Sequence, residues 1–434
     1  MRNGFEQLAS QPLYLCLAAN SKIRCSELCP LLSELIDSNS QTPYHTNSCQ
    51  HLMLRYYTAG ESHGKTMIAM VDGFPAGLEI DSAKINYDLR RRQGGYGRGQ
   101  RQKLETDEVD ILTGVWKNTT LGSPIAMQVI NRDYKLERLK ELPRPRPGHG
   151  DLSGSIKYLS SIRGILERAS ARETCVRVAA GALAKQLLEK FGIQTIGYVA
   201  SLGGAKIDPV PGSVEDQIKL RDTSEIYSLN PATDSEIKQL IDDTKAAGDT
   251  LGGVVEVRVE GVPFGLGTHA QWDRKLDGRL AQAVMAVQAI KGVEIGMGFT
   301  CADLPGSKVH DGIRYDEAAK NSSTLGYERP TNNAGGLEAG MTNGQPIVVR
   351  AAMKPISTLQ QPLESIDMQT KEPHKASYER SDICAVPACS VIIENVVAFE
   401  VAVALIDKFG GDSVAEMLER KTLFEKMARE HNAG

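Results

Sequence analysis

The sequence contains no long hydrophobic run, because nowhere in its 434 residues do about 18 apolar residues follow one another without interruption. The nearest candidate, residues 391–409, is interrupted by Glu394, Glu400 and Asp407. A segment of this kind is typical of a helix buried in a globular core. We therefore expect no membrane span.

A strong net charge is also missing. The formal net charge is −4, with 24% charged and 41% hydrophobic residues. This ordinary composition allows a large buried core, and the small net charge creates no general attraction to nucleic acid or to a membrane surface. An anion-binding site must therefore come from local clusters of Arg and Lys.

Cysteines with the spacing of a metal site are absent. No Cys-x-x-Cys pair occurs, and the closer pairs have no partner cluster elsewhere in the chain. We interpret the cysteines as buried, reduced thiols of a cytosolic protein and expect no metal. The eight positions are Cys16, Cys25, Cys29, Cys49, Cys175, Cys301, Cys384 and Cys389.

Residues 1–52 differ from the rest of the chain. They hold half of the cysteines, show no helical or strand period, and end in the polar stretch 38–50. The apolar run 13–19 resembles the core of a signal peptide only faintly, since Glu6 precedes it and few basic residues do. We expect residues 1–52 to be an extension, either disordered or translated from a misassigned upstream start, and residues 53–434 to form a single domain.

Local patterns after Met53 predict strands and long helices. Each helix has its apolar residues at helical spacing, and each strand is a short run rich in β-branched or aromatic residues. Ser82 is the expected N-cap of the first helix, and Ser170 with Glu173 forms a capping-box pattern before the second. The predicted strands are 54–58, 67–71, 254–259 and 347–353, and the predicted helices are 82–92, 171–191, 273–290 and 388–409.

The order of these elements indicates the fold class. No regular alternation of strand and helix appears, and no short repeat occurs. Long Ala-rich helices beside short alternating strands favour an α+β layered core with antiparallel sheets.

Residues 59–66 resemble a loosened phosphate-binding loop that ends in Gly64, Lys65 and Thr66. A P-loop needs Gly at the first position and a following helix, whereas Ala59 stands first and the turn residues 72–75 follow too soon. A P-loop NTPase is therefore the weaker hypothesis. What remains is His63 in a glycine-flanked turn, which from these residues alone is equally compatible with a ligand site and with an ordinary surface turn.

Residues 90–103 carry six Arg and Lys residues, four glycines and no acidic residue. Such charges repel one another unless an anion is bound. Only Tyr96 could stack on a base, so nucleic acid is the weaker hypothesis. The pattern favours a small polyanionic substrate, while a solvated surface loop remains open for about half of the arginines.

Two further segments predict anion binding or catalysis. Residues 143–151 contain three prolines, which fix the backbone around Arg146 and His149. Arg168 and Arg172 lie at the start of a helix, where free N–H groups favour a phosphate. An ordinary capped helix explains the second segment equally well.

Together these segments resemble the chorismate synthase family, and they occur in the family's order over nearly the whole chain after Met53. Residues 53–56 are similar to a typical family start. Two departures are Gly150, where the family often has Ala, and Ala169, where many members have Ser. The matching segments are 60–64, 90–101, 146–149, 170–174, 293–296, 333–336, 354–358 and 380–382.

The resemblance implies a fold in which long central helices are sandwiched between antiparallel sheets, in a cytoplasmic homotetramer. It implies an anti 1,4-elimination of phosphate from 5-enolpyruvylshikimate 3-phosphate to give chorismate, the last common step of the shikimate pathway to the aromatic amino acids. Reduced FMN is required without net redox change, and NADPH is a possible reductant of the FMN. Neither a nucleic acid nor a membrane is implied.

The resemblance also implies roles for individual residues. His63 is the general acid at the leaving phosphate, His149 stabilises or protonates the reduced flavin, and Asp382 helps flavin N5 accept the C6 proton. The implied FMN contacts are Arg168, Ala169, Ser170, Gln288, Ala289, Ala339, Lys354, Pro355, Ile356, Ser357, Thr358 and Arg380. The implied contacts to the substrate or to NADP are Arg92, Arg98, Arg101, Arg146 and Arg172.

Overall fold

The computed structural model describes residues 54–99, 105–379 and 381–431. The expectation for residues 1–52 lies outside this part of the chain and stays a prediction. Among the cysteines of the described residues, Cys175, Cys384 and Cys389 are buried thiols as expected, whereas Cys301 is exposed.

The first sheet is antiparallel and has the strand order β1-β2-β6-β3. Its alternate residues face the core, as Met67, Ala69 and Val71 show by being buried. The predicted pair of strands is confirmed, with Tyr57 opposite Met70. The strands are β1 (Arg55–Ala59), β2 (Thr66–Asp72), β6 (Ile125–Ile130) and β3 (Val109–Ile111).

The second sheet is also antiparallel, in the order β10-β15-β9-β7-β8. Val255, Val257 and Val259 of β9 are buried while the residues between them are partly exposed, which confirms the predicted half-buried strand. The predicted strand 347–353 is also confirmed. The strands are β10 (Ile290–Ile295), β15 (Ile347–Met353), β9 (Gly253–Glu260), β7 (Gln194–Leu202) and β8 (Ala205–Lys206).

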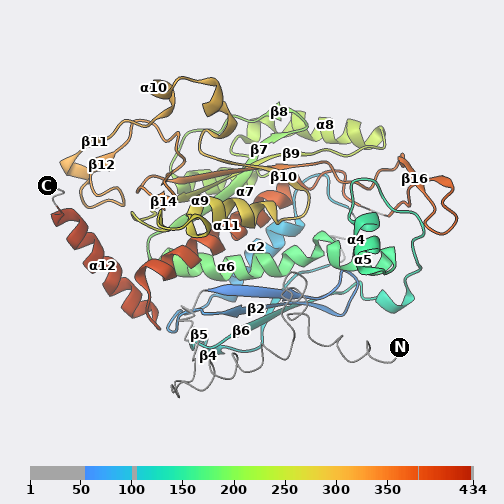
Figure 1. Cartoon of the computed structure of the whole chain (residues 1–434), viewed down its shortest axis with the longest axis horizontal. Helices are drawn as coiled ribbons and strands as arrows, with labels where there is room; N and C mark the ends of the chain where they lie inside the picture. Colours follow the sequence, from blue (N-terminus) through green and yellow to red (C-terminus); the bar gives the residue numbers. More distant parts are fainter. Residues whose placement is uncertain (1–53, 100–104, 380, 432–434) are drawn as a thin grey trace, which may run out of the picture. The chain divides into compact units, whose positions relative to one another are not determined.

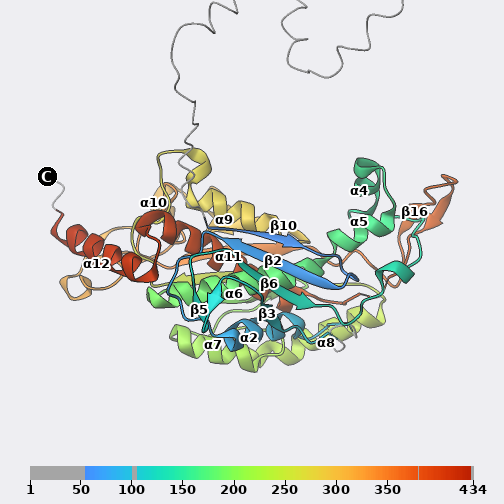
Figure 2. The same ribbon diagram turned by 90° about the horizontal axis from the view of Figure 1, so that it is seen from below.

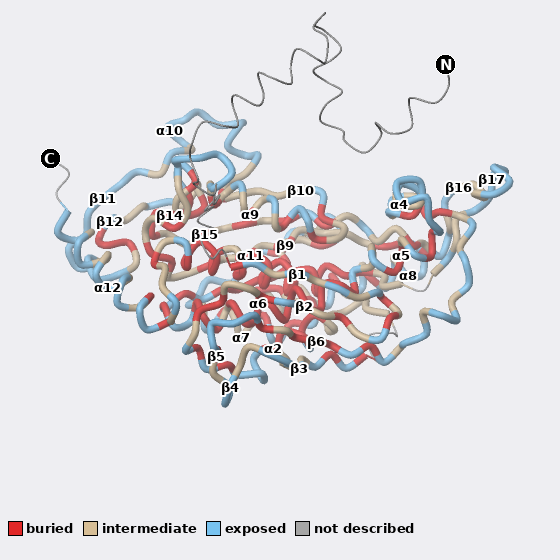
Figure 3. Tube along the Cα trace, turned by 60° about the horizontal axis from the view of Figure 1, so that its bottom comes forward, coloured by how far each residue is buried: buried red, intermediate tan, exposed pale blue. Residues whose placement is uncertain are grey.

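Two long helices, α6 (Thr174–Lys190) and α11 (Val386–Phe409), lie between the sheets (Figure 1). The first packs against β2 and β6, and the second against β7 and β9. They cross closely, because a Cβ on Gly181 would lie 2.3 Å from the backbone oxygen of Asn395. Buried residues follow both helices and the strands that face them (Figure 3). The layered α+β fold predicted from the sequence is therefore confirmed.

Within the part of the chain that the structure describes, α11 alone is long and apolar enough to cross a membrane. Of the most apolar 18-residue stretch of α11, 94% is buried inside the protein. The apolar composition is therefore explained by the position of this helix in the core.

The remaining elements cover the core and its edges. α2 (Ser82–Gln93) packs on α6, and α9 (Leu276–Met285) packs on α11; Figure 2 shows α2, α7 and α8 on one side of the layers. The other elements are β4 (Val115–Trp116), β5 (Thr119–Thr120), α4 (Asp151–Tyr158), α5 (Ile162–Ala169), α7 (Val214–Thr223), α8 (Asp234–Ala246), α10 (Gly306–Val309), β11 (Arg314–Tyr315), β12 (Tyr327–Glu328), β13 (Leu337–Glu338), β14 (Met341–Thr342), β16 (Glu364–Ile366), β17 (Pro373–Lys375), α12 (Val414–Glu430) and the 3-10 turns η1 (Leu136–Arg138), η2 (Ala171–Glu173), η3 (Pro231–Thr233), η4 (Trp272–Arg274), η5 (Gly298–Asp303) and η6 (Glu317–Ala319).

One predicted helix cap was wrong, and the other was correct in its residue but not in its capping box. The N-cap of α2 is Asp81 rather than Ser82, because the Asp81 carboxylate accepts a hydrogen bond from the backbone N–H of Ala83. The Ser170 hydroxyl accepts from the N–H of Arg172 in η2 rather than from that of Glu173. The Glu173 carboxylate instead accepts from the Thr58 hydroxyl at 2.7 Å, so a tertiary contact replaces the capping box.

The predicted helix 273–290 was wrong at both ends. Lys275 is extended and separates η4 from α9, and Ala289 has a positive φ of 68°. Ile290 then enters β10 and pairs with Met353. The apolar period that continues to residue 290 is therefore divided between α9, a turn at residues 286–289 and the first residue of β10.

The helix layer also contains a buried carboxylate, Glu394 of α11, which is fully inaccessible. It accepts hydrogen bonds from Arg91 at 2.9 Å, from Arg221 at 3.3 Å, from Lys185 and from the backbone N–H of Gly197. Burial alone would raise the pKa of Glu394, but Arg91, Lys185 and Arg221 outweigh it and hold the pKa well below its usual range. The carboxylate therefore joins α2, α6, α7 and β7 to the central helix.

Glu394→Gln is expected to destabilise the protein, because three cations lose the buried carboxylate that compensates them. Breaking one partner of a buried ion pair costs about 3–5 kcal/mol. The free energy of unfolding at pH 7, from denaturant titration, measures the effect. The exposed Glu419→Gln is the control, and its change should stay within about 0.5 kcal/mol.

The effect of Glu394→Gln should depend on pH. Because the folded-state pKa lies below the unfolded value, the stabilisation is present above about pH 4.3 and is lost as the pH falls through the folded pKa. The difference between the two proteins should therefore be full at pH 7 and shrink below about pH 4. A difference that does not change with pH would contradict the role of the Glu394 charge.

Candidate active site

A cavity with a volume of about 1900 Å³ lies next to the predicted residues. Its wall is formed by the β1–β2 turn, the glycine-rich loop after α2, residues 146–150, the start of α6 and residues 353–358. These segments are far apart in the sequence, and the layered fold brings them to the same edge of the helix layer.

Most of the predicted site residues lie in the wall of this one cavity. Arg101 and Arg380 lie outside the described residues. The predicted residues in the wall are His63, Arg92, Arg98, Arg146, His149, Ala169, Ser170, Arg172, Gln288, Ala289, Lys354, Pro355, Ile356, Ser357, Thr358 and Asp382.

Two predicted FMN contacts, Arg168 and Ala339, are not among the residues that line the cavity. Arg168 donates hydrogen bonds to the backbone oxygens of Thr58 and Gly60 and so supports the end of β1. Ala339 lies in the turn between β13 and β14. The backbone oxygen of the next residue, Gly340, accepts a hydrogen bond from the N–H of Leu276. Within a single chain the structure does not bring these two residues to the cavity.

Two arginines of the cavity share one buried carboxylate, Asp107. Arg92 Nη1 lies 3.2 Å and Arg172 Nη1 lies 2.7 Å from its oxygens. Asp107 is 1% exposed, and Arg172 Nη2 has no hydrogen-bond partner among the described residues, with Glu105 at 3.7 Å. Both guanidinium groups are therefore fixed by buried carboxylates.

Arg146 and Arg98 are held by other carboxylates. Arg146 forms two parallel hydrogen bonds to Asp151, at 2.8 and 3.0 Å, and donates a third to the Thr358 hydroxyl. Arg98 Nη1 lies 2.6 Å from Asp382, which also accepts the backbone N–H of Gly99. Asp382 therefore anchors the glycine-rich loop to the segment before α11.

His63 lies in the turn between β1 and β2. Its Nδ1 is 3.0 Å from both carboxylate oxygens of Glu167, which also accepts its backbone N–H at 2.8 Å. Asp133 lies 3.8 Å from Nε2. Burial alone would raise the pKa of Glu167, but the hydrogen bonds from His63 and the nearby Arg163 outweigh it and lower the pKa.

His149 has a similar partner. Its Nδ1 lies 2.5 Å from Asp151, which is buried at the start of α4. Burial would raise the pKa of Asp151, but hydrogen bonds from His149 and Arg146 hold the pKa far below its usual range. Both histidines are thus bound through Nδ1 to an ionised, buried carboxylate.

Sequence reasoning missed the three buried carboxylates Asp107, Asp151 and Glu167. Asp151 follows His149 by two residues, so its place in the proline-rich motif could have indicated the pair. Glu167 is 104 positions from His63, and Asp107 is 65 positions from Arg172. No local pattern connects residues at such separations.

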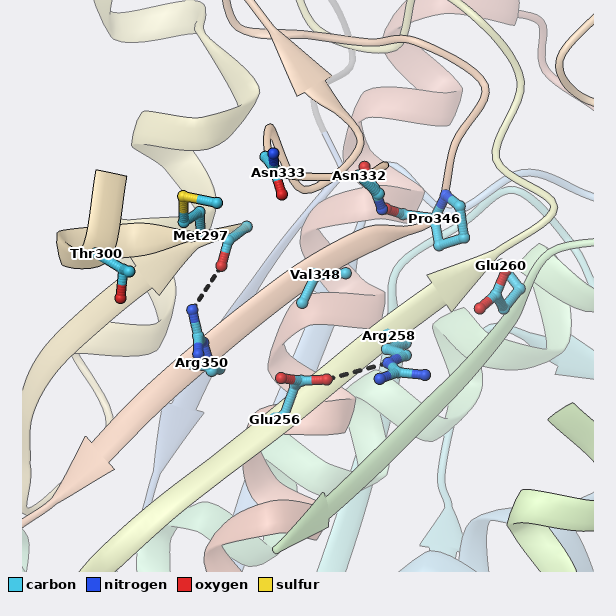
Figure 4. Close-up of a pocket in the computed structure, with 11 residues that line it drawn as sticks. Glu256, Arg258, Glu260, Met297, Thr300, Asn332, Asn333, Pro346, Val348 and Arg350 are labelled. Carbon is cyan, nitrogen blue, oxygen red and sulfur yellow. Dashed lines mark hydrogen bonds and ion pairs between the residues drawn. The ribbon is translucent and has the colours of Figure 1, made fainter. Parts of the chain in front are cut away.

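The phosphate-loop hypothesis does not fit the structure. Residues 66–72 form strand β2, so the turn does not lead into the helix that a P-loop requires. A second cavity of about 490 Å³ lies on the outer face of the second sheet (Figure 4). Glu256 and Arg258, 3.0 Å apart, and Arg350, bound to the Gly296 oxygen, line it. It contains none of the predicted site residues.

Comparisons with known proteins identify the family. The chorismate synthase family model matches residues 54–406. The chain is 54% identical to a chorismate synthase of Geotalea daltonii, over 84% of this chain and 96% of that protein. It is 50% identical to one of Desulforamulus reducens, over 87% of this chain and 100% of that protein.

A solved structure agrees with the sequence relatives. A crystal structure of chorismate synthase matches with a TM-score of 0.71 and 42% identity, over 87% of this chain and 99% of that chain. The sheets and helices that carry the cavity therefore have a counterpart in a solved member. The chain belongs to the chorismate synthase family, whose members are carbon–oxygen lyases that act on a phosphate-bearing substrate.

Proposed function

We propose that the protein converts 5-enolpyruvylshikimate 3-phosphate to chorismate by anti 1,4-elimination of phosphate, with reduced FMN as cofactor. The observation that carries this proposal is the convergence of two carboxylate-bound histidines and four arginines in one cavity. A substrate with two carboxylates and a phosphate needs several cationic donors, and guanidinium groups pair with such anions through two N–H groups.

The arginines are prepared for binding before a ligand arrives. Arg92 and Arg172 are held by Asp107, and Arg146 is held by Asp151. Because these carboxylates fix the guanidinium groups in place, little side-chain entropy remains to be lost when the substrate binds.

Several groups in the cavity fit a flavin mononucleotide. Gln288 Oε1 is buried and has no hydrogen-bond partner among the described residues, so it suits a donor on a ligand. The Ser170 hydroxyl and the N-terminal backbone of η2 suit a phosphate. The residues that would hold the cofactor are Ala169, Ser170, Gln288, Ala289, Lys354, Pro355, Ile356, Ser357 and Thr358. When bound, reduced FMN supplies the electron density for the difficult C–O cleavage without net redox change.

The side chains of the chain manage the protons. His63 donates a proton through Nε2 to the leaving phosphate, a role suited to an imidazole at neutral pH. His149 stabilises the reduced cofactor through its own Nε2. Asp382 assists the removal of the C6 hydrogen. For this role its carboxylate must release its contacts with Arg98 and the N–H of Gly99 and contact the reacting groups instead.

Three further statements belong to the same proposal. The enzyme acts in the cytoplasm, assembles as a homotetramer and accepts NADPH or an external reductant as the source of electrons for FMN. A tetramer offers a reason for the positions of Arg168 and Ala339, because a neighbouring copy can complete a site that one chain leaves open. Sedimentation of the purified protein tests the assembly.

The proposed reaction is tested with purified protein, the substrate and FMN under anaerobic conditions with dithionite. Equal amounts of chorismate and inorganic phosphate are expected, with no net oxidation of the flavin. Replacement of dithionite by NADPH shows whether the protein reduces its own cofactor. Turnover of ATP without chorismate formation would contradict the proposal and favour a nucleotide hydrolase.

Arg98→Ala is expected to weaken substrate binding far more than FMN binding. The loss of one charge-assisted hydrogen-bond partner costs roughly 1.5–3 kcal/mol. Equilibrium binding of each ligand, followed by the flavin spectrum, measures the two affinities. Arg90→Ala is the matched control, since Arg90 belongs to the same basic segment but is exposed and outside the cavity wall. Unchanged substrate affinity in Arg98→Ala would show that Arg98 does not contribute to substrate binding.

A chain that begins at Met53 is expected to fold, bind FMN and turn over at the rate of the full chain, because the family model matches residues 54–406. The measurement compares kcat, FMN affinity and the thermal midpoint of the two proteins. A large loss of activity or solubility in the shorter chain would show that residues 1–52 take part in function.

A further inference from the structure

We propose that Glu167 and Asp151 are positioning residues that hold His63 and His149 in one tautomer, with the proton on Nδ1 and with Nε2 presented to the cavity. This inference rests on the proposed roles of the two histidines. The inference assigns the same arrangement to both histidines: each imidazole is oriented by a buried carboxylate from a helix next to the cavity.

Glu167 binds His63 in a way that leaves little freedom. Its side chain is 1% exposed and accepts hydrogen bonds from both the backbone N–H and ring Nδ1 of His63. An ionised carboxylate can only accept, so Nδ1 must carry the proton. The backbone bond fixes the turn and the ring bond fixes its rotation, and Nε2 remains as the nitrogen that can act on a ligand.

Asp151 places His149 by the same logic. One oxygen lies 2.5 Å from His149 Nδ1, and the two oxygens together bind the guanidinium of Arg146. Arg146 Nη2 lies 3.2 Å from Nδ1. Because a guanidinium has no acceptor, the Nδ1 proton is directed to Asp151. One carboxylate therefore sets the tautomer of His149 and the orientation of Arg146 together.

The charges that face His63 come from several segments. Glu167 of α5 lies at Nδ1, and Asp133 lies 3.8 Å from Nε2. Lys135 pairs with Asp133 at 2.8 Å, and Arg163 lies 3.6 Å from Glu167. Each of these two carboxylates thus has a cation beside it, and Glu167 forms hydrogen bonds with the imidazole. The bond from Nδ1 to Glu167 persists whether or not Nε2 carries a proton, because an ionised carboxylate only accepts.

The decisive experiment compares Glu167→Gln and Glu167→Asp in the intact enzyme. The Gln amide has N–H groups that can donate to Nδ1, so it favours the opposite tautomer and cannot stabilise a charged ring. We expect kcat to fall by about 10–100-fold, which reaches only the lower end of the usual contribution of acid–base catalysis, with KM changed less than about threefold. The alkaline limb of the kcat–pH profile should move by about one unit to lower pH, and Glu167→Asp should restore part of both. The exposed Glu137→Gln is the control and should keep the wild-type profile.

A double-mutant cycle separates positioning from a merely structural role. If Glu167 acts through His63, then Glu167→Gln costs nothing further in the His63→Ala background. Asp151→Asn is expected to lower kcat and raise KM, since it also releases Arg146, and its kcat loss should largely disappear in the His149→Ala background. The inference would be overturned if Glu167→Gln lowered kcat equally in the wild type and in His63→Ala. A wild-type pH profile in Glu167→Gln would overturn it as well.

The same measurements distinguish this inference from the proposed function. A slow His63→Ala enzyme together with a fast Glu167→Gln enzyme overturns only the positioning role. Near-normal turnover of His63→Ala would contradict the role of His63 itself, and the inference about Glu167 would fail with it.

Discussion

His63→Ala is expected to slow turnover by about 10²–10⁴-fold, the usual contribution of a general acid. The variant loses the proton donor for the leaving phosphate but keeps the arginines that bind the substrate anions. His63 is only partly buried, in the turn between β1 and β2, and every residue of β1 pairs with β2. The variant should therefore remain folded and still form a ternary complex with oxidised FMN and substrate.

Single-turnover kinetics under anaerobic conditions measure this effect, with the flavin spectrum recorded alongside. His269→Ala is a suitable control, because His269 is exposed and outside the cavity. If chorismate forms at a near-normal rate in His63→Ala, the imidazole is not the acid of the reaction.

The second large effect is expected in His149→Ala. Turnover should again fall by about 10²–10⁴-fold, but the cause of the loss should differ from that in His63→Ala. Because His149 is proposed to stabilise the reduced cofactor, its loss should alter the protonation of bound reduced flavin. The change is visible in the absorbance spectrum as the pH is varied, whereas His63→Ala should leave that spectrum close to the wild type.

The control for His149→Ala is His374→Ala, an exposed histidine of β17. Identical pH dependence of the flavin spectrum in the wild type and in His149→Ala would contradict the assignment of His149 to the cofactor, even if activity fell. Normal activity in His149→Ala would remove this residue from the mechanism.

Elements with strong local patterns were predicted correctly. The strand at residues 347–353 and the helix that ends at Phe409 appear in the structure where the pattern placed them. In both cases the periodicity coincides with the burial of one face or of the whole element. Local propensity and tertiary packing therefore favour the same conformation there.

Elements were predicted wrongly where a tertiary partner competes with the local pattern. The apolar period of residues 273–290 continues past the end of α9, but Ile290 pairs with β15 instead. The Ser170–Glu173 pattern is a valid capping box in isolation, yet Glu173 bonds to Thr58 of the first sheet. The alternatives differ by single hydrogen bonds, and the distant partner decides between them.

The sequence by itself determined the family, the layered fold class and most of the residues that line the cavity, because these depend on short motifs and on the periods of strands and helices. Only the tertiary structure decided how those residues are held. Glu167 lies 104 positions from His63, and Asp107 lies 15 and 65 positions from Arg92 and Arg172. Their role depends on which helix end packs beside which strand, and no local pattern contains that information.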